Sequence, residues 1–519
     1  MVLEVMSAPI SALLPFVLFP LLGVPVNVDH LYSGVQQIGF LCSMLLLLAH
    51  EECGLSTRIA LYVLSRTGSS IDRVLAIVVT ASVGMTCVLD GFTVVVLLLP
   101  IIECTVDEIF FNTIHPSCHT PLGPPPAESS SSARSPRSDV WCGIQRTSYH
   151  VHRRRIFAES RKHIVDNRNT MFKTMMAALV YGTNIGSCGT PRGSQQNYYL
   201  VEYFRNCTAQ DKLGSPLNYF TWTTYSLPSM MACSAFLWWY LYHRWLPAEC
   251  RSGNHVDIEK FAFRNKYLEK RKWSFEQITT IILTGAYLFC TLVGQDWINV
   301  TADQVNLRSE SLLVALACVL FLIPAQPSQG ARSQGLLPWE AIHSRVPWGC
   351  LLLTGAGYAF SDALGEGRVT LLKCDWVLWL FKWSRTVGLG AGVFLQSVLV
   401  EIKSNTNSVI DLIPGLFATA QNEHVNPLLL LLPFTKAASL LFLLPISGYG
   451  NALLYDYARC SCWEMVQMGL PLKIVTVGLE MISLYTIGYT MFDLAKTSTA
   501  PVWPTQGGCV IVPTNVSQF

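Results

Sequence analysis

The stretch 400–414 places charged, amide and hydroxyl side chains inside an otherwise apolar run that extends from 386 to 417. Such groups are costly at the depth of a lipid bilayer unless they are paired, hydrated or bound to a ligand. At its centre stand Ser404, Asn405 and Thr406. Their amide and hydroxyl dipoles, with exposed helix ends, can hold an anion on one side and a hard cation on the other. This stretch is our first candidate functional site.

Two glycine-rich segments are also too polar to be helices that face lipid. The first is 181–197, which contains Gly189 and Thr190, and the second is 447–451, which begins at Ser447. Irregular backbone at membrane depth is tolerated only where it is buried in protein or lines a cavity. Both segments are therefore expected to lie inside the protein.

A further polar interruption, Asp90-Gly91, divides the apolar run from Val74 to Ile102. A single helix of that length would extend over about 40 Å, which exceeds the roughly 30 Å thickness of the hydrocarbon core. We therefore predict a helix break at Asp90-Gly91. The alternative is one continuous helix with a strong tilt.

The composition indicates that membrane helices position these segments. The chain is 51% hydrophobic and 13% charged, with a mean hydropathy of +0.37, whereas soluble domains are about 25% charged. The apolar runs show no period-two alternation, so we predict an all-α polytopic membrane protein with about ten transmembrane helices rather than a barrel. Runs long enough to cross the bilayer begin near residues 10, 74, 218, 278, 348, 386, 426 and 471, and shorter candidates lie at 38–49, 171–204 and 310–324.

The distribution of charge predicts which loops face the cytoplasm. Nine Lys and Arg residues lie in 103–170 and seven in 247–277, so both segments read as cytoplasmic under the positive-inside rule. The low complexity of 103–170 further predicts a partly disordered loop. Three glycosylation sequons begin at Asn206, Asn299 and Asn515, and they place the C-terminus outside.

The two halves of the chain repeat one pattern. Residues 1–246 and 247–519 each contain a long segment with a polar interruption, followed by a glycine-rich segment that ends in Asn. Matching interrupted segments are typical of secondary transporters with inverted repeats and a binding site at the midplane. The fold is therefore expected to contain broken helices and re-entrant hairpins, and Arg58 is expected at the membrane interface.

From about residue 11 to the C-terminus the sequence resembles the divalent anion sodium symporter family, which comprises sodium-coupled dicarboxylate and citrate carriers and the insect "I'm not dead yet" carriers. The chain begins at what looks like the family's second helix. The matching residues occur in family order: Leu13-Leu-Pro-Phe-Val-Leu-Phe-Pro20, Arg58-Ile-Ala-Leu61, Leu99-Pro-Ile101, Ile185-Gly186, Gly189-Thr190, Asn197, Pro347-Trp348, Glu401, Ser404-Asn405-Thr406, Asn426-Pro427, Leu444-Pro445, Asn451-Ala452 and Phe492-Asp493-Leu494.

The resemblance implies a secondary carrier of succinate, citrate or similar anions, in the plasma membrane and as a homodimer. It implies no enzymatic activity, no nucleic-acid partner, and no cofactor or metal other than sodium as coupling ion. In the family, two Ser-Asn-Thr motifs at hairpin tips bind substrate carboxylates and contribute to two sodium sites. The implied substrate-binding residues are Ser404, Asn405, Thr406, Thr190, Asn451 and Gly448, and the implied cation-site residues are Asn405, Thr86, Gly91, Gly189 and Ser447. Lys403 and Asp90 are added as candidate coupling residues because they depart from the family pattern.

Two departures from the family pattern make sodium coupling doubtful. Asp90-Gly91-Phe92 stands where the first Ser-Asn-Thr motif belongs, and Lys403 replaces a small residue near the second sodium site. A buried ammonium without a partner is costly. We hypothesise that Lys403 is a fixed cation in place of sodium, with Asp90 as counterion or proton-coupling group, which predicts an exchanger or a proton-linked carrier.

Two alternatives stay open. The chain could instead be a transport-inactive paralogue that binds an anion or regulates a partner, with Lys403 extending away from the site. Arg192, in the first glycine-rich segment, could pair with a substrate carboxylate, pair with Asp90, or face water.

Overall fold

The structure is a computed structural model in which helices account for the regular secondary structure of the described residues, apart from one isolated bridge between Pro324 and Gly335. The described residues are 35–68, 70–109, 165–209, 217–247, 256–269, 273–301, 316, 318–324, 335–356, 379–380, 384–402, 409, 412–413, 415–417, 419–420 and 423–495.

The helices differ widely in length. Those before residue 246 are α3 (Val35–Glu52), α4 (Leu55–Thr67), α5 (Ile71–Thr86), α6 (Gly91–Ile109), a helix at 165–186, α8 (Gln195–Ala209), α9 (Tyr219–Tyr240) and the π-helical turn η3 (Leu241–Trp245). Those after it include α11 (Val256–Glu269), α12 (Phe275–Thr301), α14 (Trp339–Arg345), a helix at 348–356, α17 (Arg385–Leu399), α19 (Leu428–Ser439), η6 (Pro445–Ser447), α20 (Tyr449–Asp456), α21 (Cys462–Ser483), η7 (Leu484–Gly488) and α22 (Tyr489–Met491).

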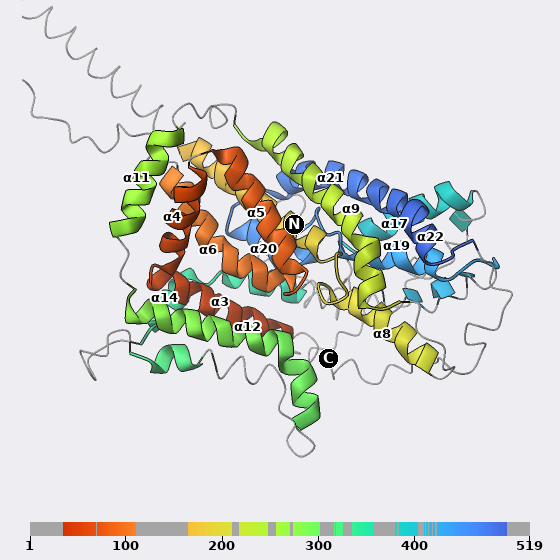
Figure 1. The fold of residues 1–519 in the computed structure, drawn as a ribbon, viewed down its shortest axis with the longest axis horizontal. Coiled ribbons are helices and arrows are strands. Elements are labelled where there is room, and N and C mark those ends of the chain that lie inside the picture. The colour runs from red at the N-terminus through yellow and green to blue at the C-terminus, as the bar shows by residue number, and fades with distance from the viewer. Residues whose placement is uncertain are drawn as a thin grey trace, which may run out of the picture.

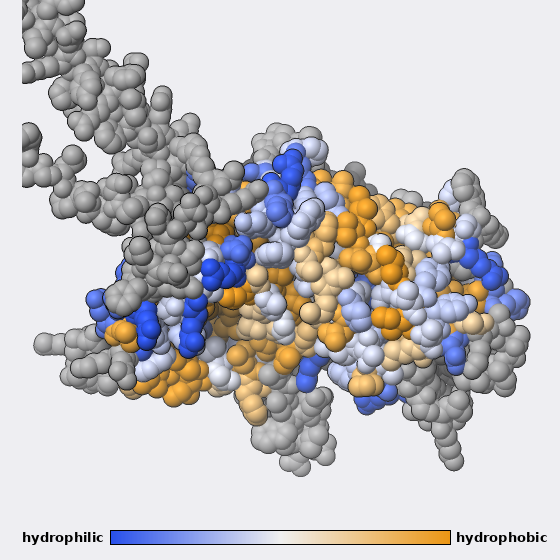
Figure 2. All heavy atoms as spheres, turned by 45° about the horizontal axis from the view of Figure 1, so that its top comes forward, coloured by the Kyte–Doolittle hydropathy of each residue, from blue (hydrophilic) through white to orange (hydrophobic). Residues whose placement is uncertain are grey.

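Helix α21 packs against α9, α17 and α19, and α9 also packs against α5 (Figure 1). Helices α9 and α21 each begin with a capping box, formed by Asn218 with Thr221 in α9 and by Ser461 with Glu464 in α21. The reciprocal bonds satisfy N–H groups that a helix start otherwise leaves unpaired. Figure 2 shows hydrophobic residues over the middle of one face and hydrophilic residues mainly toward its two ends.

Within the described ranges, one helical stretch, Cys462–Met491, is both long and apolar enough to cross a bilayer. Other apolar runs are divided into shorter pieces. The predicted break at Asp90-Gly91 is confirmed, because α5 ends at Thr86 and α6 begins at Gly91. In the run from 74 to 102, a helix break rather than low hydrophobicity therefore limits helix length.

The apolar run that begins near residue 426 does not form one continuous helix. Helix α19 ends at Ser439, and the backbone at 440–444 is not helical although its side chains are apolar. Pro445 disfavours the helical conformation at Leu444, and a carboxylate from another segment binds the N–H groups here, as described below.

Helices extend into both ends of the predicted 103–170 loop. Helix α6 continues to Ile109, and the next helix begins at 165. Ion pairs hold these helix ends, with 2.6 Å between Asp107 and Arg168 and 2.6 Å between Glu108 and Lys266. The predicted disorder concerns 110–164, which lie outside the described residues.

Arg58, which is predicted to lie at the membrane interface, is covered by protein side chains. It is 4% exposed, its guanidinium carbon lies 3.6 Å from the ring centroid of Trp273, and its Nη1 donates to Gln277 at 3.0 Å. The indole ring covers the charge and so joins α4 to the start of α12.

We expect Trp273→Ala to destabilise the protein by about 1–2 kcal/mol, because the partly desolvated cation–π contact would be lost. The thermal midpoint of the detergent-solubilised protein measures this effect. Trp463→Ala is the matched control, because Trp463 is exposed to a similar degree, 65% against 51% for Trp273, and no Lys or Arg of the described residues lies over its ring. Equal midpoints for the two variants would contradict the role assigned to Trp273.

Candidate functional site

At the break between α5 and α6, the residues predicted from the sequence as cation-site or coupling residues have structural roles. The Asp90 carboxylate accepts the backbone N–H of Thr93 at 2.9 Å and so caps α6. Asp90 is exposed. Thr86 is buried, and its hydroxyl donates to the carbonyl of Ser82 within α5. Gly91 begins α6 beside Thr86, 3.5 Å from its methyl group as measured from a Cβ built on Gly91.

The first glycine-rich segment forms a buried loop at 187–194 that is tied to this break. The Thr190 hydroxyl donates to the carbonyl of Cys87 at 2.7 Å and accepts the N–H of Gly193 at 3.1 Å. Its proton is thus used inside the protein and is not free for a bound anion. Gly189 and Gly186 allow close approach, since a Cβ on Gly186 would lie 2.6 Å from the carbonyl oxygen of Val83.

The Asn197 amide closes this loop from α8. Its Nδ2 donates to the carbonyl oxygens of Ser187 at 2.9 Å and Thr190 at 3.2 Å, which lie ten and seven residues earlier. Asn197 is fully buried, and its Oδ1 has no hydrogen-bond donor among the described residues.

The second glycine-rich segment shows the same arrangement around Asn451. Its Nδ2 donates to the carbonyl oxygens of Leu441 at 3.4 Å and Leu444 at 3.2 Å, again ten and seven residues earlier, and to Ser447 Oγ at 2.7 Å. Ser447 in turn donates to the carbonyl of Leu444 at 2.6 Å. Asn451 is 2% exposed, and in the described part of the chain its Oδ1 also lacks a donor.

The structure brings the two loops together. The Asn184 amide donates to the carbonyl of Leu441, and Ser194 Oγ lies 3.0 Å from Ser439 Oγ. Gly448 precedes α20 in extended backbone. Thr190 and Asn451, predicted from distant parts of the sequence, therefore belong to two loops in direct contact.

The two carboxamide oxygens are the groups best suited to a ligand. Each is a buried acceptor without a described donor, and amide, hydroxyl and carbonyl oxygens are what hard cations prefer. Oxygen atoms of this kind are therefore suitable ligands for an ion such as Na⁺. The described residues contain no group of three His, Cys, Asp or Glu side chains placed to hold a metal ion.

Two buried ion pairs lie beside these loops. Lys436 Nζ is 2.5 Å from Glu480 Oε2, and Lys473 Nζ is 2.5 Å from Glu401 Oε1. Both lysine side chains are fully buried, and the glutamate side chains are 4% and 1% exposed. A charge taken out of water requires such a partner.

Sequence reasoning missed these two ion pairs, although one signal was available. Lys473, Thr476, Glu480 and Ser483 recur at helical spacing in an apolar run and are buried on one face of α21. That spacing predicts a polar stripe facing protein rather than lipid. It does not identify the partners, which come from other segments.

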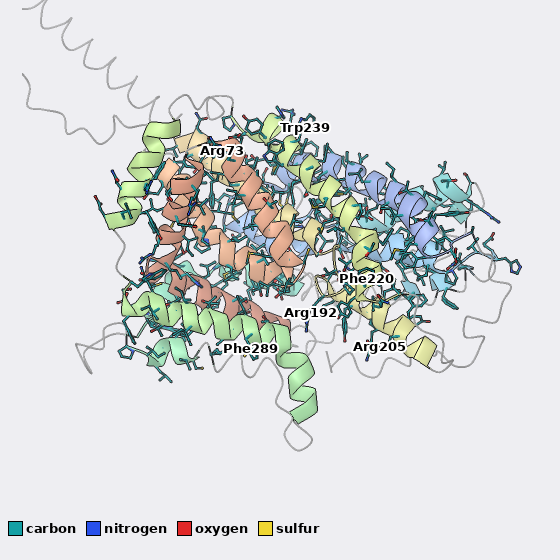
Figure 3. All side chains as sticks on the ribbon, in the orientation of Figure 1. Arg73, Arg192, Arg205, Phe220, Trp239 and Phe289 are labelled. Atoms are coloured by element: carbon teal, nitrogen blue, oxygen red, sulfur yellow. The ribbon has the colours of Figure 1, made fainter. Side chains whose placement is uncertain are left out.

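Several predicted residues are not placed. Lys403, Ser404, Asn405, Thr406 and Asn515 lie outside the described residues. Asn206 and Asn299 lie in the last turns of α8 and α12, and Arg192 is exposed at the loop edge (Figure 3).

Comparison with known proteins identifies a family of membrane transporters. The family described as "Sodium:sulfate symporter transmembrane region" matches residues 1–493. The sodium-dependent low-affinity dicarboxylate transporter 1 of Caenorhabditis elegans is 24% identical over 512 residues, which cover 95% of this chain and 85% of that protein. The Na(+)/citrate cotransporter of Rattus norvegicus is 23% identical, with coverage of 95% and 89%.

The protein "I'm not dead yet" of Drosophila melanogaster is 22% identical over 537 residues, which cover 97% of this chain and 84% of that protein. The long family match and these near full-length alignments agree with the buried loops and charges seen here. The chain therefore belongs to the sodium:sulfate symporter family of transporters and is a multi-pass integral membrane protein rather than an enzyme.

Proposed function

We propose that the chain is a secondary active transporter of di- and tricarboxylates such as succinate and citrate, and that it works as a homodimer in the plasma membrane. The observation that carries the proposal is the pair of contacting loops with equal hydrogen-bond offsets around Asn197 and Asn451. The printed substrates of the relatives, dicarboxylates and citrate, supply the substrate class.

The repeated offsets support two inverted repeats at 1–246 and 247–519, with about ten membrane spans. In this arrangement each repeat contributes one glycine-rich loop. The remaining site residues come from Ser404, Asn405 and Thr406, the surviving triplet. Glycosylation at Asn206, Asn299 and Asn515 is proposed for the outer face.

The coupling ion is the finer part of the proposal. The two buried carboxamide oxygens without described donors support a bound cation. Two sequence features favour transport that does not depend on sodium and proceeds by exchange or proton coupling. They are Lys403 and the replacement of the first triplet by Asp90-Gly91-Phe92. The decisive measurement is uptake of labelled succinate and citrate by proteoliposomes, with sodium replaced by choline and at several pH values.

We expect uptake in sodium to fall more than tenfold in Asn451→Leu, because the variant loses both the loop contacts and the unpaired oxygen. Asn218→Ser is the matched control, because Asn218 is a helix cap at the exposed start of α9 and Ser caps helices equally well. Full uptake by the Leu variant would refute the assignment of Asn451 to the site.

The second candidate is an anion-binding or regulatory membrane protein without flux, which the loss of the first triplet favours. Binding of labelled citrate to the purified protein, with no uptake in proteoliposomes, would select this candidate. Uptake against a gradient would exclude it.

A further inference from the structure

We propose that the Lys473–Glu401 pair is an internal clasp that holds the unwound segment 440–444, and that Glu401 is thereby a positioning residue for the loop of Ser447 and Asn451. The importance of this clasp for transport rests on the proposed function. Its role in holding the segment 440–444 is independent of that function and is tested separately.

The carboxylate binds three successive N–H groups of the segment. Glu401 Oε1 accepts from Phe442 at 2.7 Å and from Leu443 at 3.1 Å, and Oε2 accepts from Leu444 at 3.1 Å. These residues follow the end of α19, so their N–H groups are not used in a helix. The side chain of Glu401 thus replaces helical carbonyls as the acceptor for buried backbone.

The ammonium connects the same carboxylate to a second helix end. Lys473 Nζ donates to Glu401 Oε1 and to the carbonyl of Ser397, each at 2.5 Å. Ser397 lies in the last turn of α17, where carbonyls lack helical partners and carry the negative end of the helix dipole. The pair therefore provides a hydrogen-bond donor for a carbonyl at the end of α17 and an acceptor for the N–H groups that follow α19.

The other buried pair has the same distance and burial but a different role. Lys436 contacts Glu480, Ser229 Oγ at 3.0 Å and the face of the Tyr225 ring at 4.6 Å. Within the described ranges, Glu480 accepts no backbone N–H. Lys436–Glu480 links side chains of α19, α21 and α9, whereas Lys473–Glu401 holds backbone.

The position of Glu401 connects the clasp to the loop of Ser447 and Asn451. The bound groups at 442–444 directly precede Pro445 and Ser447, and the carbonyl of Leu444 accepts from both Ser447 and Asn451. The N–H of Leu444 therefore faces the clasp while its carbonyl faces the loop. A displacement of the Leu444 backbone would therefore move both Ser447 and Asn451.

Two neutral double variants separate the acceptor from the charge. Glu401→Gln with Lys473→Met removes both charges but keeps a carbonyl oxygen, whereas Glu401→Leu with Lys473→Met removes the acceptor too. The control is Lys436→Met with Glu480→Gln, which neutralises the other pair.

The test is hydrogen–deuterium exchange of peptides that cover 440–448 in purified full-length protein. We expect exchange at least tenfold faster in the Leu/Met variant, a smaller increase in the Gln/Met variant and none in the control. Native protection in the Leu/Met variant would overturn the clasp, as would equal loss of protection in the control. If the Leu/Met variant does not fold, exchange in Gln/Met that matches the wild type at Leu444 would overturn it, because the Gln amide nitrogen cannot accept that N–H.

Uptake by the same proteins tests the link to function. We expect the KM for succinate to rise about tenfold in the Leu/Met variant and to stay within threefold in the control. Faster exchange with an unchanged KM would overturn the positioning role. Absence of uptake by the wild type would refute the proposed function while the exchange data still judge the clasp.

Discussion

Replacing Gly469 with alanine is expected to push α21 away from the unwound segment and to destabilise the protein by about 3 kcal/mol, the upper end of the usual range for overpacking. A Cβ on Gly469 would collide with the carbonyl oxygen of Phe442 and would lie 2.7 Å from its carbonyl carbon. These are backbone atoms, held on their N–H side by Glu401. They cannot yield as the end of a flexible side chain would.

The measurement is the thermal midpoint and the yield of monodisperse protein in detergent. Gly478→Ala is the matched control on the same helix, because a Cβ at Gly478 would meet nothing within 4 Å. Alanine there is expected to be neutral or to stabilise α21 by up to about 1 kcal/mol. Equal behaviour of the two variants would show that α21 does not approach this backbone closely.

The parts of the fold that could be predicted from sequence are those with a local cause. Asp90-Gly91 interrupts an overlong apolar run and has a side chain that caps the next helix, so the break follows from nearby residues. The glycine-rich loops likewise show their polarity and their asparagines directly. The equal offsets around Asn197 and Asn451 could not be predicted, because only the structure shows which carbonyls the two amides contact.

The end of α19 could not be predicted because its main cause lies elsewhere in the chain. The residues from Leu428 to Leu444 read as one hydrophobic helix, and Pro445 alone accounts for only the last of them. The acceptor for the N–H groups of Phe442, Leu443 and Leu444 is Glu401, about forty residues earlier. A hydrophobicity pattern contains no information on such a tertiary hydrogen bond.

The protein cover of Arg58 could not be predicted for a related reason. A charged turn next to an arginine is typical of a membrane interface, and nothing near it in sequence indicates burial. Its cover is Trp273, more than two hundred residues later. Apolar and aromatic partners from distant segments decide whether a charge faces water.

Replacing Lys436 with methionine is expected to cost about 3–5 kcal/mol, because Glu480 would remain as an unpaired charge in a buried site. Lys436 is the cation that faces this carboxylate, at 2.5 Å, and the Glu480 side chain is only 4% exposed. The reverse change, Glu480→Gln, should cost less. The Lys436 ammonium would still contact Ser229 Oγ and the Tyr225 ring, and a cation over an aromatic face keeps part of its stabilisation.

The double variant Lys436→Met with Glu480→Gln distinguishes this mechanism from a simple packing defect. With both charges removed, most of the loss should be recovered, because replacing a whole buried pair is often close to neutral. Thermal midpoints of the wild type, the two single variants and the double variant form the required cycle. A double variant no more stable than Lys436→Met would mean that the methionine side chain packs poorly and that the unpaired carboxylate is not the cause of the instability. The expected order instead places the double variant nearest the wild type, Glu480→Gln next and Lys436→Met last, and that order follows only if the unpaired carboxylate is the main source of the instability.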